Sequence, residues 1–296
     1  MLGWRLAISA VLIPALIGLF WLDAAAGESA WVLLVLCVLL AIRASWEMVD
    51  LLRTRAMQPA WLPVAVCSVG IILTSWFRWG DNGDGANDLS RLAAIGLAYA
   101  ISVLLLMLHS AVRYRQPGGQ MESLGAELLV TSYVGVLLAV TAQLRWVAGH
   151  EAGYLVLGSL VIAAKAGDIG GYTVGRLFGK RKMTPYLSPG KTWMGALGAV
   201  VFAGAGGCLW LHFATPYFLQ FASPPATVWA VCYGVCIGVV GLIGDLCESL
   251  VKRDVEKKDS ATLLPGFGGL LDLLDSVLYA GPVAYLLWQV IPLRTW

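Results

Sequence analysis

Residues 228–244 read VWAVCYGVCIGVVGLIG, seventeen residues without one charged side chain. An α-helix needs about 17 to 25 apolar residues to cross the hydrocarbon core of a bilayer, so this stretch predicts a membrane-spanning helix. Charged residues return only at its end, where Asp245 and Glu248 precede Lys252 and Arg253. The stretch therefore indicates both the fold class, helices in a membrane, and a place where charged side chains gather.

Similar apolar windows occupy most of the 296-residue chain, in which only 13% of residues are charged, against about a quarter in soluble domains. They fall at 6–22, 31–42, 61–77, 92–108, 128–144, 154–167, 195–213, 228–244 and 270–293. We therefore predict an all-α, polytopic membrane protein with about nine transmembrane helices. Residues 1–150 would supply the N-terminal membrane helices and residues 151–296 the C-terminal, catalytic-type helices with their cytoplasmic loops, in one integral membrane unit.

The Lys and Arg residues are distributed unevenly between the predicted connections. With the N-terminus inside, fifteen of the twenty fall on the inner side, four fall outside, and Lys165 lies within a span. Positively charged loops stay in the cytoplasm, so we predict a cytoplasmic N-terminus in the cell (inner) membrane. The net charge of +2 does not indicate a nucleic-acid partner. Because the three histidines stand alone, neither a histidine zinc site nor a nucleophilic triad is expected.

Carboxylates at membrane depth cost at least about 2.5 kcal/mol on insertion scales, so they usually face a partner or a cavity. In the sequence they stand out only after residue 160, in three places: Asp168 beside Lys165, Asp245 with Glu248, and Asp272 with Asp275. Residues three apart share a helical face, and we expect these acids to meet at the cytoplasmic side. Mg²⁺ binds one or two carboxylates together with phosphate oxygens, so a magnesium site is predicted. The alternative is a polar seam in which the acids pair with Lys165, Lys252 and Arg253.

Two basic segments and one glycine-rich break accompany the acids. Residues 175–182 (GRLFGKRK) and 188–192 (SPGKT) place cations among glycine, serine and threonine, which suits phosphate binding; orientation and contact with anionic lipids are the alternative. Residues 264–269 (LPGFGG) break the chain directly before Asp272. Irregular backbone at membrane depth is tolerated where it lines a cavity, and glycines let backbone approach a ligand, although the break also suits a simple re-entry turn.

Residues 249–276, SLVKRDVEKKDSATLLPGFGGLLDLLDS, resemble the C-terminal signature of phosphatidate cytidylyltransferases, also called CDP-diacylglycerol synthases. The preceding stretch is similar to that family as well, through Asp168, Gly171-Tyr172, Gly175-Arg176, Gly179-Lys180, Ser188-Pro189, Lys191-Thr192-Trp193 and Gly195. The specific resemblance covers about residues 165–280, whereas the first 150 match only as hydrophobic spans. It implies transfer of CMP from CTP to phosphatidic acid with Mg²⁺, giving CDP-diacylglycerol and pyrophosphate.

The resemblance also implies roles for individual residues. Asp245 and Asp272 would be the metal ligands, with Asp275 and Asp168 close by as further catalytic carboxylates. Contacts to the substrates would come from Arg176, Ser188, Lys191, Thr192, Lys252, Arg253, Lys258, Asp259, Gly268 and Gly269. CTP, phosphatidic acid and membrane lipids are the expected partners, and the sequence leaves a homodimer open.

Four positions depart from the family pattern, which usually has lysine at Gly190, glutamate at Met194, histidine at Phe267 and arginine at Leu273. An arginine–phosphate contact contributes about 1.5 to 3 kcal/mol, so its loss would slow the reaction by about one to two orders of magnitude. A CTP-dependent lipid kinase and an inactive paralogue or scaffold therefore remain alternatives. A transporter is disfavoured because the outer halves of the spans are apolar.

Overall fold

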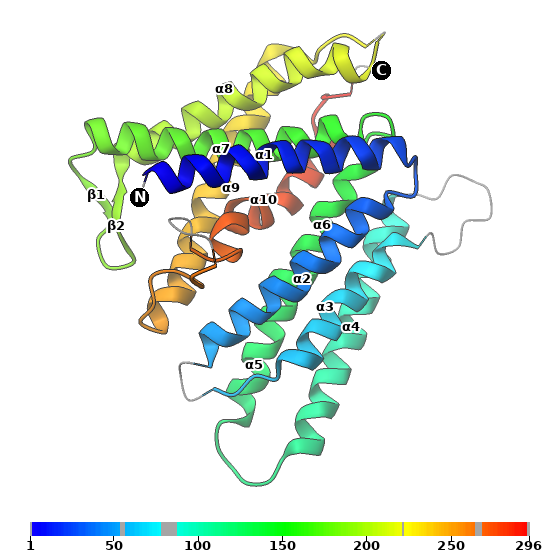
Figure 1. Ribbon diagram of the computed structural model, residues 1–296, viewed down its shortest axis with the longest axis vertical. Helices are drawn as coiled ribbons and strands as arrows, with labels where there is room; N and C mark the ends of the chain where they lie inside the picture. The colour runs from blue at the N-terminus through cyan, green and yellow to red at the C-terminus, as the bar shows by residue number, and fades with distance from the viewer. Residues whose placement is uncertain (1, 54–56, 78–87, 221, 264–267, 295–296) are drawn as a thin grey trace. The chain divides into compact units, whose positions relative to one another are not determined.

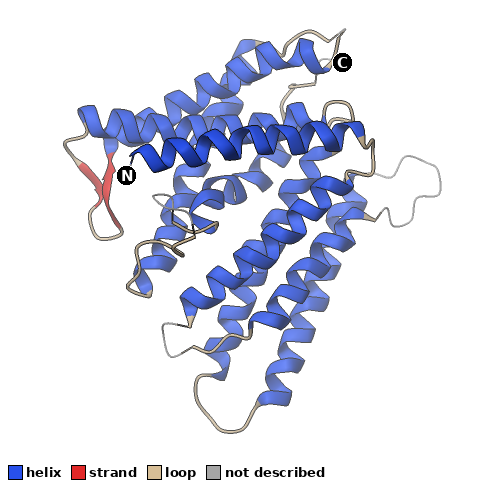
Figure 2. Ribbon diagram, viewed as in Figure 1, coloured by secondary structure: helices blue, strands red, loops and turns tan. Residues whose placement is uncertain are grey.

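The computed structural model describes residues 2–53, 57–77, 88–220, 222–263 and 268–294, and these are almost wholly helical (Figures 1 and 2). The helices are α1 (Leu2–Ala25), α2 (Trp31–Leu52), α3 (Trp61–Trp76), α4 (Asp88–Arg113), α5 (Gln120–Val130), α6 (Leu137–Ala142), α7 (Gly153–Phe178), α8 (Trp193–Phe218), α9 (Thr227–Asp254) and α10 (Leu271–Val290). A π-helical turn, Thr131–Val136, joins α5 to α6, and the 3-10 turn Gln143–Arg145 follows. Residues 120–145 thus form one nearly continuous helical segment.

Each of the nine predicted windows falls on one of these helical segments. Within the described ranges, eight segments are long and apolar enough to cross a membrane, and α3 is a shorter apolar helix of 16 residues. The all-α, polytopic fold class is therefore confirmed. Three helices continue well past their predicted windows: α2 runs on to Leu52, α7 to Phe178 and α9 to Asp254.

The chain forms two compact units, residues 1–143 with 254–273 and residues 144–253 with 274–296. One boundary falls in the 3-10 turn after Gln143, and the other two fall inside α9 and α10, so each of these two helices contributes residues to both units. The division at residue 150 stays a prediction about the organisation of the membrane segments.

The first unit contains buried carboxylates that hold helix ends together. Asp23, at the end of α1, is fully buried and accepts hydrogen bonds from the backbone N–H groups of Val32 and Leu33 at 2.8 and 3.0 Å. Glu127 of α5 is also buried and accepts one from the N–H of Ala60, at the start of α3, at 2.8 Å. The first N–H groups of a helix lack partners within the helix, so these carboxylates act as caps supplied from elsewhere in the chain. The expectation that acids in the spans stand out only after residue 160 was wrong.

In the second unit, α7 and α8 pack against each other and are joined by a β-hairpin, shown in red in Figure 2. Strand β1 (Lys182–Thr184) pairs antiparallel with β2 (Ser188–Thr192). From the sequence we expected an inner loop over 176–191; α7 instead takes its first residues and the hairpin most of the rest. The segment is too short and too polar to show the apolar alternation that marks a strand.

The α7–α8 interface depends on small residues. A Cβ atom added at Gly198 of α8 would lie 2.6 Å from the carbonyl oxygen of Gly170 of α7, closer than real Cβ contacts. Helices associate in membranes largely by such close backbone approach, because lipid tails provide no hydrophobic driving force between them. The packing holds α7, and with it Lys165 and Asp168, in a fixed place within the second unit.

Candidate active site

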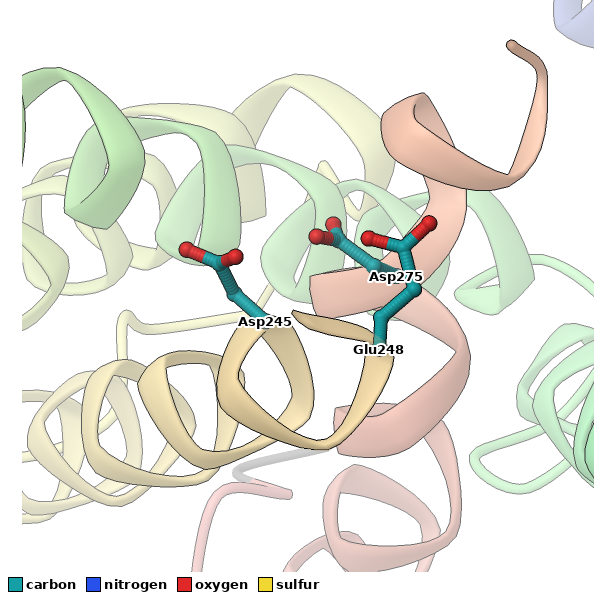
Figure 3. A group of neighbouring side chains, drawn as sticks. All are labelled: Asp245, Glu248 and Asp275. Atoms are coloured by element: carbon teal, nitrogen blue, oxygen red, sulfur yellow. The ribbon is translucent and has the colours of Figure 1, made fainter. Parts of the chain in front are cut away.

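Three carboxylates gather in the second unit, two from α9 and one from α10 (Figure 3). Asp245, Glu248 and Asp275 each offer one oxygen, and these three oxygens all lie within 4.8 Å of one another. Asp245 and Glu248 are three residues apart and so share a face of α9. Glu248 and Asp275 are buried, with 5% and 7% exposure. Buried carboxylates this close repel one another unless cations compensate them.

Two lysines supply part of that compensation. Lys191 Nζ lies 2.8 Å from Asp245 Oδ2, and Lys252 Nζ lies 2.5 Å from Glu248 Oε2. Lys252 follows Glu248 by one helical turn on α9, whereas Lys191 comes from strand β2. The hairpin, which the sequence did not predict, is therefore the element that carries a cation to Asp245.

A third lysine lies on α7. Lys165 Nζ is 2.8 Å from Asp168 Oδ2 and also donates to Ser276 Oγ at 3.2 Å. The Ser276 hydroxyl in turn donates to Asp168 Oδ2 at 3.4 Å, and the Ser276 backbone N–H donates to Asp275 Oδ1. The fully buried Ser276 thereby connects Lys165 and Asp168 to Asp275, the member of the carboxylate cluster that lies on α10.

Asp272 occupies the first turn of α10 and belongs to the first unit. Its Oδ2 atom accepts hydrogen bonds from the N–H and the hydroxyl of Ser260, each at 2.9 Å, and from the N–H of Gly269 at 2.7 Å. Gly268 has a φ of +93°, and a Cβ atom there would overlap the Asp272 carboxylate. The two glycines therefore let the backbone approach the carboxylate of Asp272. From the sequence we had expected them to let the backbone approach a bound ligand.

The carboxylate cluster suits a magnesium ion. Ligand oxygens of octahedral Mg²⁺ lie about 2.1 Å from the ion, which places neighbouring oxygens about 3 Å and opposite ones about 4 Å apart. The three carboxylate oxygens lie within 4.8 Å of one another, close to this range of separations. Oxygen-only donors are also the chemical type that Mg²⁺ prefers. In the described part of the chain, this is the group of acids that meets the geometric requirement for a metal.

The sequence model of the cytidylyltransferase family matches residues 4–291. The chain belongs to this family. A phosphatidate cytidylyltransferase of Pseudomonas aeruginosa is 32% identical to it in an alignment that covers 97% of each chain. Similar proteins of the same name occur in Mycobacterium leprae, 31% identical over 88% of this chain and 80% of the relative, and in Mycobacterium bovis, 31% identical over 78% and 72%. The similarity of this chain to the family therefore extends over its first 150 residues. It is not limited to residues 165–280, where the specific motif resemblance lies.

Several of the other predicted contact residues have partners outside the carboxylate cluster. Arg176 is exposed and donates to the Tyr172 hydroxyl at 2.8 Å, and Arg253 Nε donates to the Leu187 carbonyl at 3.3 Å. Thr192 is buried, and its Oγ1 caps α8 by accepting from the Gly195 N–H at 3.1 Å. Ser188 is half-buried on β2, opposite Thr184 in the hairpin register, and Lys258 and Asp259 are exposed.

The structure describes three of the four departures from the family pattern. Gly190 is exposed on β2, and a Cβ atom there would meet nothing within 4 Å. Met194 is 39% exposed in the first turn of α8, and Leu273 is half-buried in α10. The fourth departure, Phe267, lies outside the described residues. So do the Pro265-Gly266 break before it and two of the twenty Lys and Arg residues, Arg55 and Arg78.

Sequence reasoning missed Glu47, a fully buried residue of α2. Its Oε2 atom accepts hydrogen bonds from the Leu271 N–H at 3.0 Å and from the Ser260 hydroxyl at 3.3 Å. The signal was present, because a carboxylate within an apolar helix is costly without partners. It was overlooked because the predicted window ended at residue 42, five residues before Glu47.

Proposed function

We propose that the chain transfers CMP from CTP to the phosphate of phosphatidic acid, forming CDP-diacylglycerol and pyrophosphate. Membership of the cytidylyltransferase family and the names of the relatives support this reaction. The observation that carries the proposal is the meeting of Asp245, Glu248 and Asp275 with lysines on β2 and α9. Carboxylates for a metal beside cations for phosphates are what a nucleotide triphosphate requires.

Mg²⁺ would be held by Asp245, Glu248 and Asp275. Asp272 lies three residues before Asp275 on α10, and we retain it as a further carboxylate for the metal–triphosphate complex. When bound, the ion supplies positive charge to the transferring phosphoryl group and to the pyrophosphate that leaves. The predicted ligand pair, Asp245 with Asp272, is thereby widened to include the acids that cluster with Asp245.

The lysines would exchange partners during substrate binding. Lys191 and Lys252 contact carboxylates in the structure, and they would contact phosphate oxygens once those carboxylates hold Mg²⁺. The exposed Arg176, Arg253 and Lys258 would bind the outer phosphates. The phosphatidic acid oxygen is already ionised, so it attacks the α-phosphorus in line without a protein nucleophile or base.

We place the protein in the cell (inner) membrane, with its N-terminus and active site on the cytoplasmic side. The support is the charge asymmetry, fifteen of twenty Lys and Arg residues in connections on one side. CTP is a charged cytosolic nucleotide, whereas phosphatidic acid resides in the bilayer. A site at the cytoplasmic headgroup level is accessible to both substrates.

Radiolabelled CTP tests the reaction and separates it from the kinase alternative. Purified protein in vesicles that contain both phosphatidic acid and a lipid alcohol, diacylglycerol, receives Mg²⁺ and CTP labelled either at the α- or at the γ-phosphorus. Cytidylyl transfer moves only the α-label into lipid, and Asp275→Asn should abolish that transfer. Incorporation of the γ-label instead would identify a lipid kinase. No labelled lipid from a folded wild-type chain, across several lipid phosphates and nucleotides, would refute an enzymatic role and favour an inactive paralogue.

A further inference from the structure

Glu47 has an unusual place among the buried carboxylates of the first unit. It lies on α2 and contacts residues more than 200 positions later in the chain: the N–H of Leu271, where α10 begins, and the hydroxyl of Ser260. Its other oxygen, Oε1, lies 2.9 Å from Arg43 Nη2 one turn earlier on α2. A fully buried carboxylate with two donors and a guanidinium around it is held in one orientation.

The Ser260 hydroxyl connects Glu47 to Asp272. It lies 3.3 Å from Glu47 Oε2 and 2.9 Å from Asp272 Oδ2, and the Ser260 N–H donates to the same Asp272 oxygen at 2.9 Å. The two carboxylates therefore share one serine. Glu47 fixes the loop from the other side through Leu271, the residue directly before Asp272.

Gly269 shows how closely this arrangement is packed. A Cβ atom there would lie 2.5 Å from Glu47 Oε2 and 2.9 Å from the Ala261 backbone nitrogen, and it would overlap the Ser260 hydroxyl. The Gly269 N–H meanwhile donates to Asp272. A side chain at this position would push Ser260 away from both carboxylates. Glu47, Ser260, Gly269 and Asp272 thus form one contact group, which we call the Glu47 network.

We propose that Glu47 is a positioning residue for cytidylyl transfer, which holds the Asp272 carboxylate through Ser260 and the start of α10 in the orientation that the metal–nucleotide complex requires. The inference rests on the proposed function, in which Asp272 serves that complex. It gives α2, from the N-terminal half of the chain, a part in the reaction. A residue that hydrogen-bonds to a metal ligand, without touching the metal itself, commonly changes metal affinity by about 10- to 100-fold.

The test compares isosteric variants of the full-length protein in lipid nanodiscs. Glu47→Gln keeps the shape but loses the charge that faces Arg43, and Ser260→Ala removes the shared hydroxyl while keeping the Ser260 N–H. We expect the Mg²⁺ concentration for half-maximal transfer to rise about tenfold in Glu47→Gln, with KM for phosphatidic acid unchanged. The double variant Glu47→Gln with Ser260→Ala should show the same Mg²⁺ requirement as Glu47→Gln alone, because two substitutions that break one shared contact do not have additive effects.

Glu127→Gln is the matched control. Glu127 is equally a buried carboxylate of the first unit that accepts a backbone N–H, but its donor is Ala60 at the start of α3. It should leave the Mg²⁺ requirement within about twofold of wild type. If Glu47→Gln and Glu127→Gln lower kcat alike with no change in Mg²⁺ requirement, both roles are merely structural and the proposal is overturned.

A second measurement does not depend on activity. Hydrogen exchange of the amides of Ser260, Gly269 and Leu271 should be faster in Glu47→Gln and Ser260→Ala, and unchanged in Glu127→Gln, since these amides lie in or beside the Glu47 network. An inactive wild type with this exchange pattern would refute the proposed function while showing that Glu47 holds the loop. Wild-type exchange rates in Glu47→Gln would refute the positioning role itself. Should Glu47→Gln not yield folded protein, Ser260→Ala alone decides by the same two readouts.

Discussion

Lys191 and Asp245 form an ion pair, 2.8 Å from Nζ to Oδ2, that joins strand β2 to α9 within the second unit. The side chains are 15% and 39% exposed. Lys191 is largely buried, but the Asp245 carboxylate is partly open to solvent, which screens the pair, so we expect it to contribute only about 0 to 1 kcal/mol to stability. Its importance lies in placing a cation beside an acid that the proposed reaction assigns to the metal.

Lys191→Met should therefore reduce activity more than stability. A charge-assisted contact to phosphate contributes about 1.5 to 3 kcal/mol, so kcat/KM for CTP should fall about 10- to 100-fold. The thermal unfolding midpoint in detergent should stay close to that of wild type. Steady-state kinetics with CTP as the varied substrate measure the effect.

Lys182→Met is the control for this variant. Lys182 is exposed on β1, opposite Thr192 in the hairpin register, and the proposal assigns it no phosphate contact. Its kinetics should match wild type within about twofold. Equal losses in both variants would mean that the general charge of the hairpin, and not the Lys191 position, supports the reaction.

Asp245→Asn should raise the magnesium requirement. Replacing one carboxylate of the cluster removes a negative ligand, and we expect at least a tenfold increase in the Mg²⁺ concentration for half-maximal activity. EDTA should abolish activity in wild type, and added Mg²⁺ should restore it. Glu122→Gln, which alters an exposed acid of α5 in the first unit, serves as control. An unchanged Mg²⁺ titration in Asp245→Asn would refute its assignment as a ligand.

The Glu248–Lys252 pair should separate stability from activity. Both side chains are largely buried, 5% and 11% exposed, and removing one partner of a buried pair costs about 3 to 5 kcal/mol. Lys252→Met should therefore lower the unfolding midpoint. The double variant Glu248→Gln with Lys252→Met leaves no such charge and should recover most of that loss, since both side chains keep their approximate volume. Thermal unfolding in detergent measures both effects.

Activity should not recover with stability in the double variant, because it lacks a proposed metal ligand and a proposed phosphate contact. A double variant that is both stable and active would assign the pair to the polar seam that the sequence left as an alternative. It would also remove Glu248 from the proposed metal site.

Hydropathy was enough to place the helices, because a chain that crosses a bilayer must satisfy its backbone within each span. The ends of the helices were less predictable. The window that stopped at residue 42 hid Glu47, although α2 runs to Leu52. A charge near the end of an apolar run looks like the end of a span, and only its partners, Ser260 and Leu271 far along the chain, explain why it is buried.

The sequence indicated which types of residue contribute to the site, but not which of these residues lie together. Spacing correctly placed Asp245 and Glu248 on one face of α9, a property of the helix itself. It could not decide how Asp272 and Asp275 differ, because two acids one turn apart look alike in sequence. In the structure Asp275 joins the cluster, whereas Asp272 accepts three hydrogen bonds from Ser260 and Gly269. The contact between Lys191 and Asp245 depends on a β-hairpin. Its short strands show no apolar alternation, so the sequence did not predict it.

Gly190 allows a gain of function to be predicted. The family usually has lysine at this position, next to Lys191 on β2, and the structure leaves the space around Gly190 open. Its φ lies outside the left-handed region that favours glycine, so a side chain imposes no backbone strain. Gly190→Lys should therefore fold like wild type.

The added cation in Gly190→Lys should attract the triphosphate. An exposed charge pair contributes up to about 1 kcal/mol, so we expect KM for CTP to fall about fivefold, with kcat little changed. The gain should shrink at high salt, because the distance over which exposed charges attract each other falls from about 10 Å at 0.1 M to about 3 Å at 1 M ionic strength. Gly190→Gln, of similar length but uncharged, is the matched control and should keep the wild-type KM. Equal effects of Lys and Gln would attribute the change to hairpin rigidity, since replacing glycine alone reduces the conformational freedom of the unfolded strand.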